Sequence, residues 1–329
     1  MNNKDIINIF YSLLERQDND SLRQCSTYLN KIIGPKYFKN INVNSNKITN
    51  YKFRYFVHKY NLSINVIRVK NIFELTYLNS HKVKSIIFNN GFNYDYYNYF
   101  LLQSLQSLTF GYEFNKEIKE NVLPSSLQSL TFGYYFNQEI KENVLPSSLQ
   151  SLTFGTCFNQ EIKENILPSL LQSLTFGYWF NQEIKKKVLP SSLQNLRFGS
   201  YFNQEIKENI LPLSLKSLTF CWRYNQEIKE NILSSSLQSL KFGEEFNQEI
   251  KENVLPSSLQ SLIFGNSFNQ KIKENVLPSS LQSLTFGSYF NQEIKENVLP
   301  SSLQNLKFHK NYTNFLKKIE KLNLKILYN

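Results

Sequence analysis

Residues 123–144 read L-P-S-S-L-Q-S-L-T-F-G-Y-Y-F-N-Q-E-I-K-E-N-V, and close copies of this 22-residue unit follow one another along most of the chain. Its central phenylalanine recurs at a constant spacing of 22 residues, from Phe110 to Phe308. A fixed period of this length is typical of repeat proteins, in which each copy buries its apolar side chains against its neighbours. The sequence therefore predicts a solenoid of about ten to eleven coils over residues 85–308.

Each copy is too short for a strand plus a full-length helix, so we expect one short strand and a compact return. In the strand, Leu130 and Phe132 would point inward and Thr131 outward. Eight of the ten glycines follow the central phenylalanine, where we expect a turn that needs backbone freedom, and eight of the nine prolines fall in the L-P step. Segment 137–143 is expected to form one helical or 3₁₀ turn capped by Asn137.

Stacked copies would align their strands at about 4.8 Å per coil into one parallel sheet. An asparagine stands at the same place in nine consecutive copies, and two interpretations are open for this column. It is either a ladder that bonds the backbones of adjacent coils, or a local turn or cap residue. The column consists of Asn115, Asn137, Asn159, Asn181, Asn203, Asn225, Asn247, Asn269 and Asn291.

The motif F-N-Q-E-I, preceded by L-P-S-S-L-Q-S-L-T-F-G, resembles the FNIP repeat, a 22-residue relative of the leucine-rich repeat. The resemblance covers residues 85–316 and implies a leucine-rich-repeat-like parallel β-sheet. The chain departs from the motif at its fourth position, where Glu139, Glu161 and Glu183 replace proline. The L-x-x-L-x-F pattern fits a leucine-rich repeat, whereas the asparagine falls two positions later than in that repeat.

FNIP-repeat proteins often carry an amino-terminal F-box, and residues 1–45 show two amphipathic helical faces. Residues 21–30 and 34–38 are similar to the second half of an F-box, although the leading Leu-Pro pair is missing. Two interpretations are open: an F-box-like module that docks on a Skp-type adaptor, or a helical cap that covers the first coil. The candidate docking or core residues are Phe10, Leu13, Leu14, Leu22 and Leu29.

The remaining segments are a transition over residues 46–84 and an amphipathic carboxy-terminal cap over residues 309–329. In the transition, Ile64 and Val66 lie in register with the later inward strand positions, as an eroded coil would. The alternative is a connector between helix and strand.

Copies differ most in the two columns after the strand, which a solenoid would place side by side. These columns are rich in Tyr, Trp and Arg, the residues enriched at the energetic centres of protein interfaces. They are either a partner-binding strip or turn positions that drifted after duplication. The candidate strip contains Tyr112, Tyr134, Tyr135, Tyr178, Trp179, Tyr201, Trp222, Arg223 and Tyr289. A third column, the outward strand residue, is mostly Thr but becomes Arg197, Lys241, Ile263 and Lys307.

Catalytic chemistry finds no support in the sequence, because His58, His81 and His309 have no clustered partners and the repeats lack phosphate-loop and metal-ligand spacings. We predict neither catalytic residues nor a cofactor. Three dispersed cysteines suit a reducing compartment, and no apolar run has the roughly 18 residues of a transmembrane helix. We expect a cytoplasmic or nuclear protein, in the host cytoplasm if the genome is viral.

The formal net charge of +11 belongs to the two ends, since residues 101–308 carry 18 basic and 19 acidic side chains. Basic ends leave nucleic-acid binding as a third, less favoured hypothesis. The favoured one is a non-catalytic protein-recognition protein, with the F-box resemblance implying a substrate receptor of a cullin-RING ubiquitin ligase. The alternative is an interaction scaffold without a link to ubiquitin.

Overall fold

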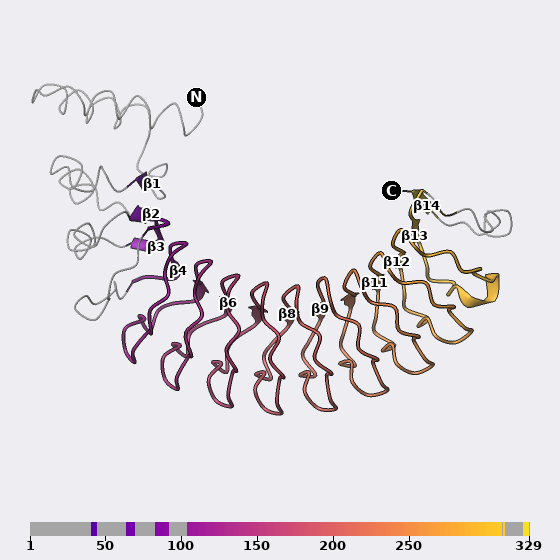
Figure 1. Cartoon of the computed structure of the whole chain (residues 1–329), viewed down its shortest axis with the longest axis horizontal. Helices are drawn as coiled ribbons and strands as arrows, with labels where there is room; N and C mark the ends of the chain where they lie inside the picture. Colours follow the sequence, from indigo (N-terminus) through magenta and orange to yellow (C-terminus); the bar gives the residue numbers. More distant parts are fainter. Residues whose placement is uncertain are drawn as a thin grey trace, which may run out of the picture.

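The computed structural model describes residues 41–44, 64–69, 83–91, 104–310, 312 and 325–328. All described strands belong to one sheet, in which they follow one another in sequence order and each pairs in parallel with the next. The coils form an open arc with the strands along its inner, concave side (Figure 1). The predicted leucine-rich-repeat-like parallel solenoid is confirmed.

The strands of the regular copies are three residues long, and the terminal ones are longer. The strands are β1 (Ile41–Asn44), β2 (Ile64–Val69), β3 (Val83–Phe88), β4 (Ser107–Thr109), β5 (Ser129–Thr131), β6 (Ser151–Thr153), β7 (Ser173–Thr175), β8 (Asn195–Arg197), β9 (Ser217–Thr219), β10 (Ser239–Lys241), β11 (Ser261–Ile263), β12 (Ser283–Thr285), β13 (Asn305–Phe308) and β14 (Lys325–Tyr328). A 3₁₀ turn, η3 (Glu296–Val298), lies between β12 and β13.

Equivalent residues of neighbouring coils lie directly opposite one another, so Leu130 of β5 pairs with Leu108 and Leu152. The inward positions are as predicted, because Leu130 and Phe132 are buried in the core. Thr131 between them is half-buried on the opposite face of the sheet, which is the concave face of the arc. The strand itself begins and ends one residue earlier than we expected, because Phe132 lies beyond the last paired residue. Its N–H still donates to Thr153 O of the next coil at 2.9 Å.

Strand pairing extends past both ends of segment 85–308, since β1, β2 and β14 join the sheet. The register expected for Ile64 and Val66 is wrong. Ile64 pairs with Val83 and Val66 with Ser85, while Ile67 takes the place opposite Ile86. The connection before β3 is therefore shorter than one 22-residue period, which a constant spacing could not anticipate.

The asparagine column is an inter-coil ladder, which decides between the two interpretations. The Oδ1 atom of Asn137 accepts the backbone N–H of Asn159 at 2.9 Å and the Nε2 group of Gln160 at 3.1 Å. The same pair of bonds recurs from coil to coil. A polar return segment that has no helix thus satisfies its donors through the neighbouring coil.

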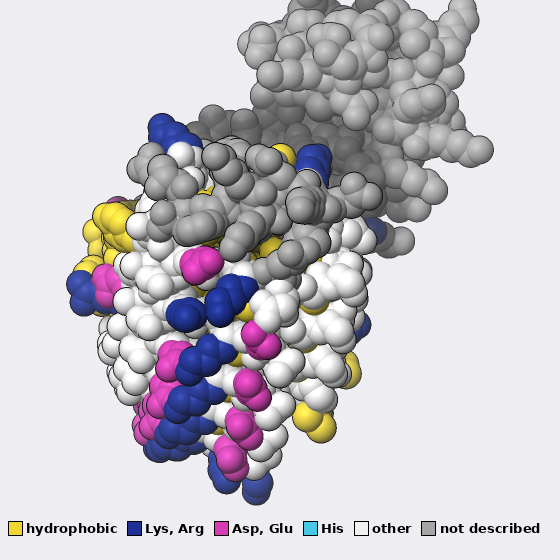
Figure 2. Space-filling view, turned by 90° about the vertical axis from the view of Figure 1, so that its right-hand side faces the viewer, with side chains coloured by type: hydrophobic (Ala, Val, Ile, Leu, Met, Phe, Trp, Pro, Cys, Tyr) yellow, Lys and Arg dark blue, Asp and Glu magenta, His cyan; other side chains and the backbone are white. Residues whose placement is uncertain are grey.

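A second ladder of ion pairs runs over the outer side of the coils. Each lysine binds the glutamate 24 residues before it, as Lys163 does with Glu139 at 2.6 Å, and seven such pairs lie in the described coils. Figure 2 shows the lysines as a row with carboxylates on both sides. These side chains are exposed, and their charges pair between coils rather than within one copy.

The helical turn expected for 137–143 is absent from this coil. Among the described copies, η3 is the one place where such a turn forms. Elsewhere the return ends in a left-handed residue, such as Asn143 with a φ of 60°. Asparagine tolerates that conformation better than most residues because its short side chain can bond locally.

The reason we gave for the glycine column is also wrong, since no described glycine has a positive φ. The constraint is steric. A Cβ atom added to Gly177 would lie 1.8 Å from the carbonyl oxygen of Gly155 in the preceding coil. Glycine is required here because two backbones approach each other closely.

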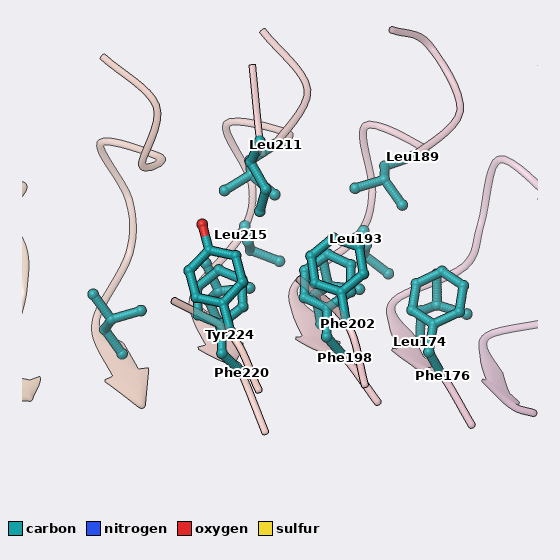
Figure 3. Close-up of a cluster of buried hydrophobic side chains, with 14 of the residues drawn as sticks. Leu174, Phe176, Leu189, Leu193, Phe198, Phe202, Leu211, Leu215, Phe220 and Tyr224 are labelled. Atoms are coloured by element: carbon teal, nitrogen blue, oxygen red, sulfur yellow. The ribbon is translucent and has the colours of Figure 1, made fainter. Parts of the chain in front are cut away.

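Two continuous stacks of aromatic rings run through the core of the coils (Figure 3). Within one coil Phe198 and Phe202 stack at a centroid distance of 3.9 Å, and each stacks on its counterparts in adjacent coils at 5.5–6.2 Å. Tyr224 occupies the second column in the next coil and is fully buried. Offset stacking contributes beyond the burial of apolar area, so each coil depends on its neighbours for stability.

Candidate interaction surface

The variable columns follow each strand after the phenylalanine and, in most coils, a glycine, so they form the edge of the arc next to the concave sheet. Backbone bonds hold them in place from coil to coil: Trp179 N donates to Thr156 O at 3.0 Å and Tyr201 N to Tyr178 O at 3.0 Å. The side chains are therefore carried by a rigid edge although they are exposed. The predicted strip is contiguous, but its aromatic residues gather in two clusters.

The first cluster consists of Tyr112, Tyr134 and Tyr135. The rings of Tyr112 and Tyr134 stack at 4.6 Å, and Tyr135 meets both edge-on at 5.0–5.2 Å. Partial desolvation, followed by the nearby Tyr135 and Tyr134, raises the pKa of the Tyr112 phenol. The Tyr112 phenol is thus a neutral hydrogen-bonding group at neutral pH.

The second cluster consists of Tyr178, Trp179 and Tyr201, with Arg223 beside them. The Trp179 and Tyr201 rings lie 4.1 Å apart, and Tyr178 contacts both at 5.2 Å. The Arg223 guanidinium lies 4.0 Å from the Tyr201 ring centre, a cation–π contact. Trp179 nevertheless exposes 43% of its surface.

The structure does not bring the other two aromatic candidates into these clusters. The Nε1 group of Trp222 donates to Glu245 Oε1 at 3.0 Å, which ties this ring to the acidic side chain of the next coil. Tyr289 is 68% exposed and makes no ring contact with another described aromatic residue. A coil with the smaller Thr156 and Cys157 separates the two clusters, and its Cys157 thiol has a pKa raised by desolvation.

The concave sheet face beside the second cluster carries two exposed basic residues. Arg197 and Lys241 stand on β8 and β10, each opposite Thr219 of β9. Both influence the Cys221 thiol, whose pKa is raised by burial first, while the two cations oppose that rise. The sequence singled out this column, but the strand register was needed to bring the two cations to either side of one threonine.

Two exposed leucines were not anticipated. Leu213 exposes 74% of its surface and Leu170 exposes 55%. Leu170 replaces a serine that elsewhere bonds the preceding coil, as Ser126 Oγ does by donating to Leu105 O at 2.7 Å. The sequence signal was present, because the second serine of L-P-S-S-L is nearly invariant.

The docking candidates Phe10, Leu13, Leu14, Leu22 and Leu29 lie outside the described residues. In the part of the chain that is described, no cluster of three His, Cys, Asp or Glu side chains could hold a metal ion. No helix among the described residues has the length and apolar character needed to cross a membrane.

Comparison with known proteins agrees with the geometry. The FNIP repeat family matches residues 100–135, 136–179, 180–221, 224–267 and 268–311. A solved structure described as that of CroV588, a novel circular LRR protein, superposes with a TM-score of 0.72 and 40% sequence identity. The similarity covers 92% of this chain and 51% of that one, so the chain spans about half the length of that protein.

No curated protein matches the sequence. The repeat-solenoid fold is one that typically serves as a scaffold for protein interactions. Because the family matches more than half of the residues, the chain belongs to the FNIP-repeat proteins.

Proposed function

We propose that the chain is a non-catalytic recognition protein that binds a protein partner through the aromatic strip. The observation that supports this most is the second cluster, in which Tyr178, Trp179 and Tyr201 contact one another while Tyr178 and Trp179 remain exposed and Tyr201 is half-buried. Rings held by neighbouring rings lose little conformational freedom on binding, so their contact area is converted efficiently into affinity. Clustered Trp, Tyr and Arg side chains are also the residues that dominate protein interfaces energetically.

The test uses the fact that the chain has two tryptophans, Trp179 and Trp222. In a Trp222→Ser variant, the tryptophan fluorescence of the chain comes from Trp179 alone. A partner isolated with the full chain and then purified should shift the Trp179 emission and protect it from acrylamide quenching.

The Trp179→Ser/Tyr201→Ser variant should lose at least about thirtyfold in affinity, since residues at the centre of an interface typically contribute about 2 kcal/mol or more. Leu213→Ser, at an exposed position outside the strip, is the control and should bind normally. A partner that binds the double variant as tightly as the wild type would show that the strip is not the interface.

Adaptor docking by residues 1–45 stays a proposal that rests on the F-box resemblance. If it is correct, the full chain binds a purified Skp-type adaptor, and Leu22→Asp and Leu29→Asp abolish binding while circular dichroism of the repeats is unchanged. A folded full chain that does not bind the adaptor would favour the scaffold alternative. Retention of nucleic acid at low salt, lost steeply as salt rises, would instead favour the third hypothesis.

A further inference from the structure

We infer that the second aromatic cluster and the adjoining concave face together form a binding site for a short, extended acidic peptide segment that carries an aromatic or other apolar side chain. This inference rests on the proposed recognition function and specifies the chemistry of the partner. Acidic side chains of the segment would face Arg197 and Lys241, and its apolar side chain would lie on Trp179 and Tyr201.

The charge of the concave face is the first argument. Two residues of each three-residue strand point away from the core, and from β4 to β13 the outward positions include three cations and no carboxylate: Arg197, Lys241 and Lys307. Arg197 and Lys241 are the exposed pair, and neither forms an ion pair with a carboxylate of the described residues. These two cations are available to an acidic ligand.

The nearest acidic side chains on the edge are already engaged. Glu244 Oε2 accepts the backbone N–H of Asn266 at 3.1 Å, and Glu245 Oε1 accepts the indole N–H of Trp222. Their charges are therefore directed along the edge toward the following and preceding coils. The cations keep the concave side of the patch positive.

The aromatic cluster and the basic pair are continuous in space. Arg197 and Tyr201 belong to the same coil and are separated by Phe198, Gly199 and Ser200. Arg223 adds a third cation over the Tyr201 ring at 4.0 Å. A ligand that reaches from the rings to the sheet thus passes from an apolar contact to a positive one.

The dimensions fit a peptide. The patch spans the coils of β7 to β10, which are three strand spacings of about 4.8 Å, or roughly 14 Å. An extended chain rises about 3.3 Å per residue, so a segment of about five residues covers this length. The threonine and serine hydroxyls between the cations can bond its backbone.

An acidic peptide fits better than a nucleic acid. Arg197 and Lys241 are about 10 Å apart across two strand spacings, and the nearest further cation of the outward strand positions, Lys307, is three strands beyond Lys241. A single strand of nucleic acid needs a continuous basic groove that follows its phosphates. Two or three separate cations match a few carboxylates instead.

The test selects binders from a displayed library of random 12-residue peptides with the full chain as bait. We expect the selected sequences to be enriched in Asp and Glu within about five residues of an aromatic or other apolar residue. One of them, synthesised with a fluorescent label, is then titrated against wild-type protein and variants.

Arg197→Thr/Lys241→Thr takes the residue that other copies carry at this column, so folding should be retained, which circular dichroism checks. We expect the affinity to fall at least tenfold and to become less sensitive to salt. Lys307→Thr removes the same type of charge from another part of the face and is the matched control, expected to bind normally. Trp179→Ser/Tyr201→Ser should also lose at least tenfold.

Each other outcome has a distinct meaning. Selected peptides that lack acidic residues, or that bind Arg197→Thr/Lys241→Thr normally while needing Trp179, would overturn this inference and leave the proposed function standing. Acidic peptides that bind Trp179→Ser/Tyr201→Ser normally, or a complete failure to select peptides, would overturn it as well, and the partner titration described above then decides the proposed function separately. A labelled single-stranded DNA 20-mer that binds through Arg197 and Lys241, in the absence of acidic binders, would overturn it in favour of nucleic acid.

Discussion

The side chain of Tyr224 is fully buried, and its hydroxyl has no hydrogen-bond partner in the structure. Burial, followed by the charge of Glu205, raises the pKa of this phenol, so it is neutral at every working pH. An unsatisfied buried hydroxyl costs about 1–3 kcal/mol. Tyr224→Phe restores the residue found in most copies and is expected to raise the free energy of unfolding in urea by about 1 kcal/mol. Tyr312→Phe is the matched control, because Tyr312 stands in the same column but its hydroxyl donates to Gln292 O at 3.1 Å; this variant should lose stability.

The second prediction at the residue scale concerns Lys187, which has a φ of 64° at a position where seven other copies hold a left-handed asparagine. A left-handed conformation strains most side chains more than it strains Asn. Lys187→Asn should therefore raise the melting temperature by a few degrees. Lys186→Asn, one residue away, removes the same charge without relieving that strain. Equal effects of the two substitutions would assign the change to charge rather than to the backbone.

At the scale of the element, a coil holds its return segment through its neighbour. Asn137→Ala removes the acceptor of the Asn159 N–H and of the Gln160 amide. We expect a loss of about 1 kcal/mol or more, because a partly buried donor is left without its bond. Hydrogen exchange should be faster at Asn159 than at the equivalent Asn203, which lies three coils from the substitution. The control, Gln138→Ala, removes one bond to Asn115 and keeps the acceptor, so the Asn159 amide should stay protected.

A substitution of Leu170, in the turn before the strand, should add a bond between coils rather than remove one. Leu170→Ser restores the residue whose hydroxyl donates to the preceding coil elsewhere, and it removes an exposed apolar side chain. We expect equal or higher stability and less aggregation on heating, measured by light scattering. Leu213→Ser removes an exposed leucine from a position without the ladder bond and should change solubility alone.

Some features of the elements could be predicted from the repeated sequence, and others could not. The period predicted the strands and the buried Leu130 and Phe132, because these depend on residues that recur in every copy. For the asparagine column it left two interpretations open, and the bonds between coils decide for the ladder. The return segment was misjudged because Asn143 satisfies its left-handed position without a helix. The role of Gly177 was misjudged because a close approach between two coils leaves no trace within one copy. The strip residues were identifiable from their variation, whereas the contact of Arg223 with Tyr201 depends on side-chain packing between copies.

For the whole molecule, the ladder of ion pairs predicts how stability depends on pH. A side-chain hydrogen bond and the charge of Lys163 lower the pKa of Glu139 from 4.5, and Lys163 itself has a pKa raised from 10.5 by Glu139. The lowered carboxyl pKa adds stability that is present above pH 4.5 and is lost as the pH falls through the folded value. The raised amine pKa adds stability that is present below pH 10.5 and is lost as the pH rises through its folded value.

The melting temperature should therefore form a plateau between about pH 5 and 10 and fall on both sides. Added salt should reduce the difference in melting temperature between pH 7 and pH 3.5, because it screens the attraction between exposed charges. A variant with Glu139, Glu183 and Glu205 changed to Gln should show a smaller fall in melting temperature on the acidic side, because a paired lysine lowers the pKa of each of these carboxyls. An unchanged slope would show that the paired charges contribute nothing measurable, as often happens with surface pairs.

The in-register stacking of nearly identical coils has a consequence for how this protein can change over generations. Unequal exchange between two copies of its gene segment would remove or add 22 residues while every column of the core, the asparagine ladder and the ion pairs continues across the junction. Because these contacts are preserved, an arc that is one coil shorter should still fold. Loss of the copy that carries Thr156 and Cys157 would bring the two aromatic clusters into contact. The number of coils between the clusters therefore sets the distance between these side chains along the edge.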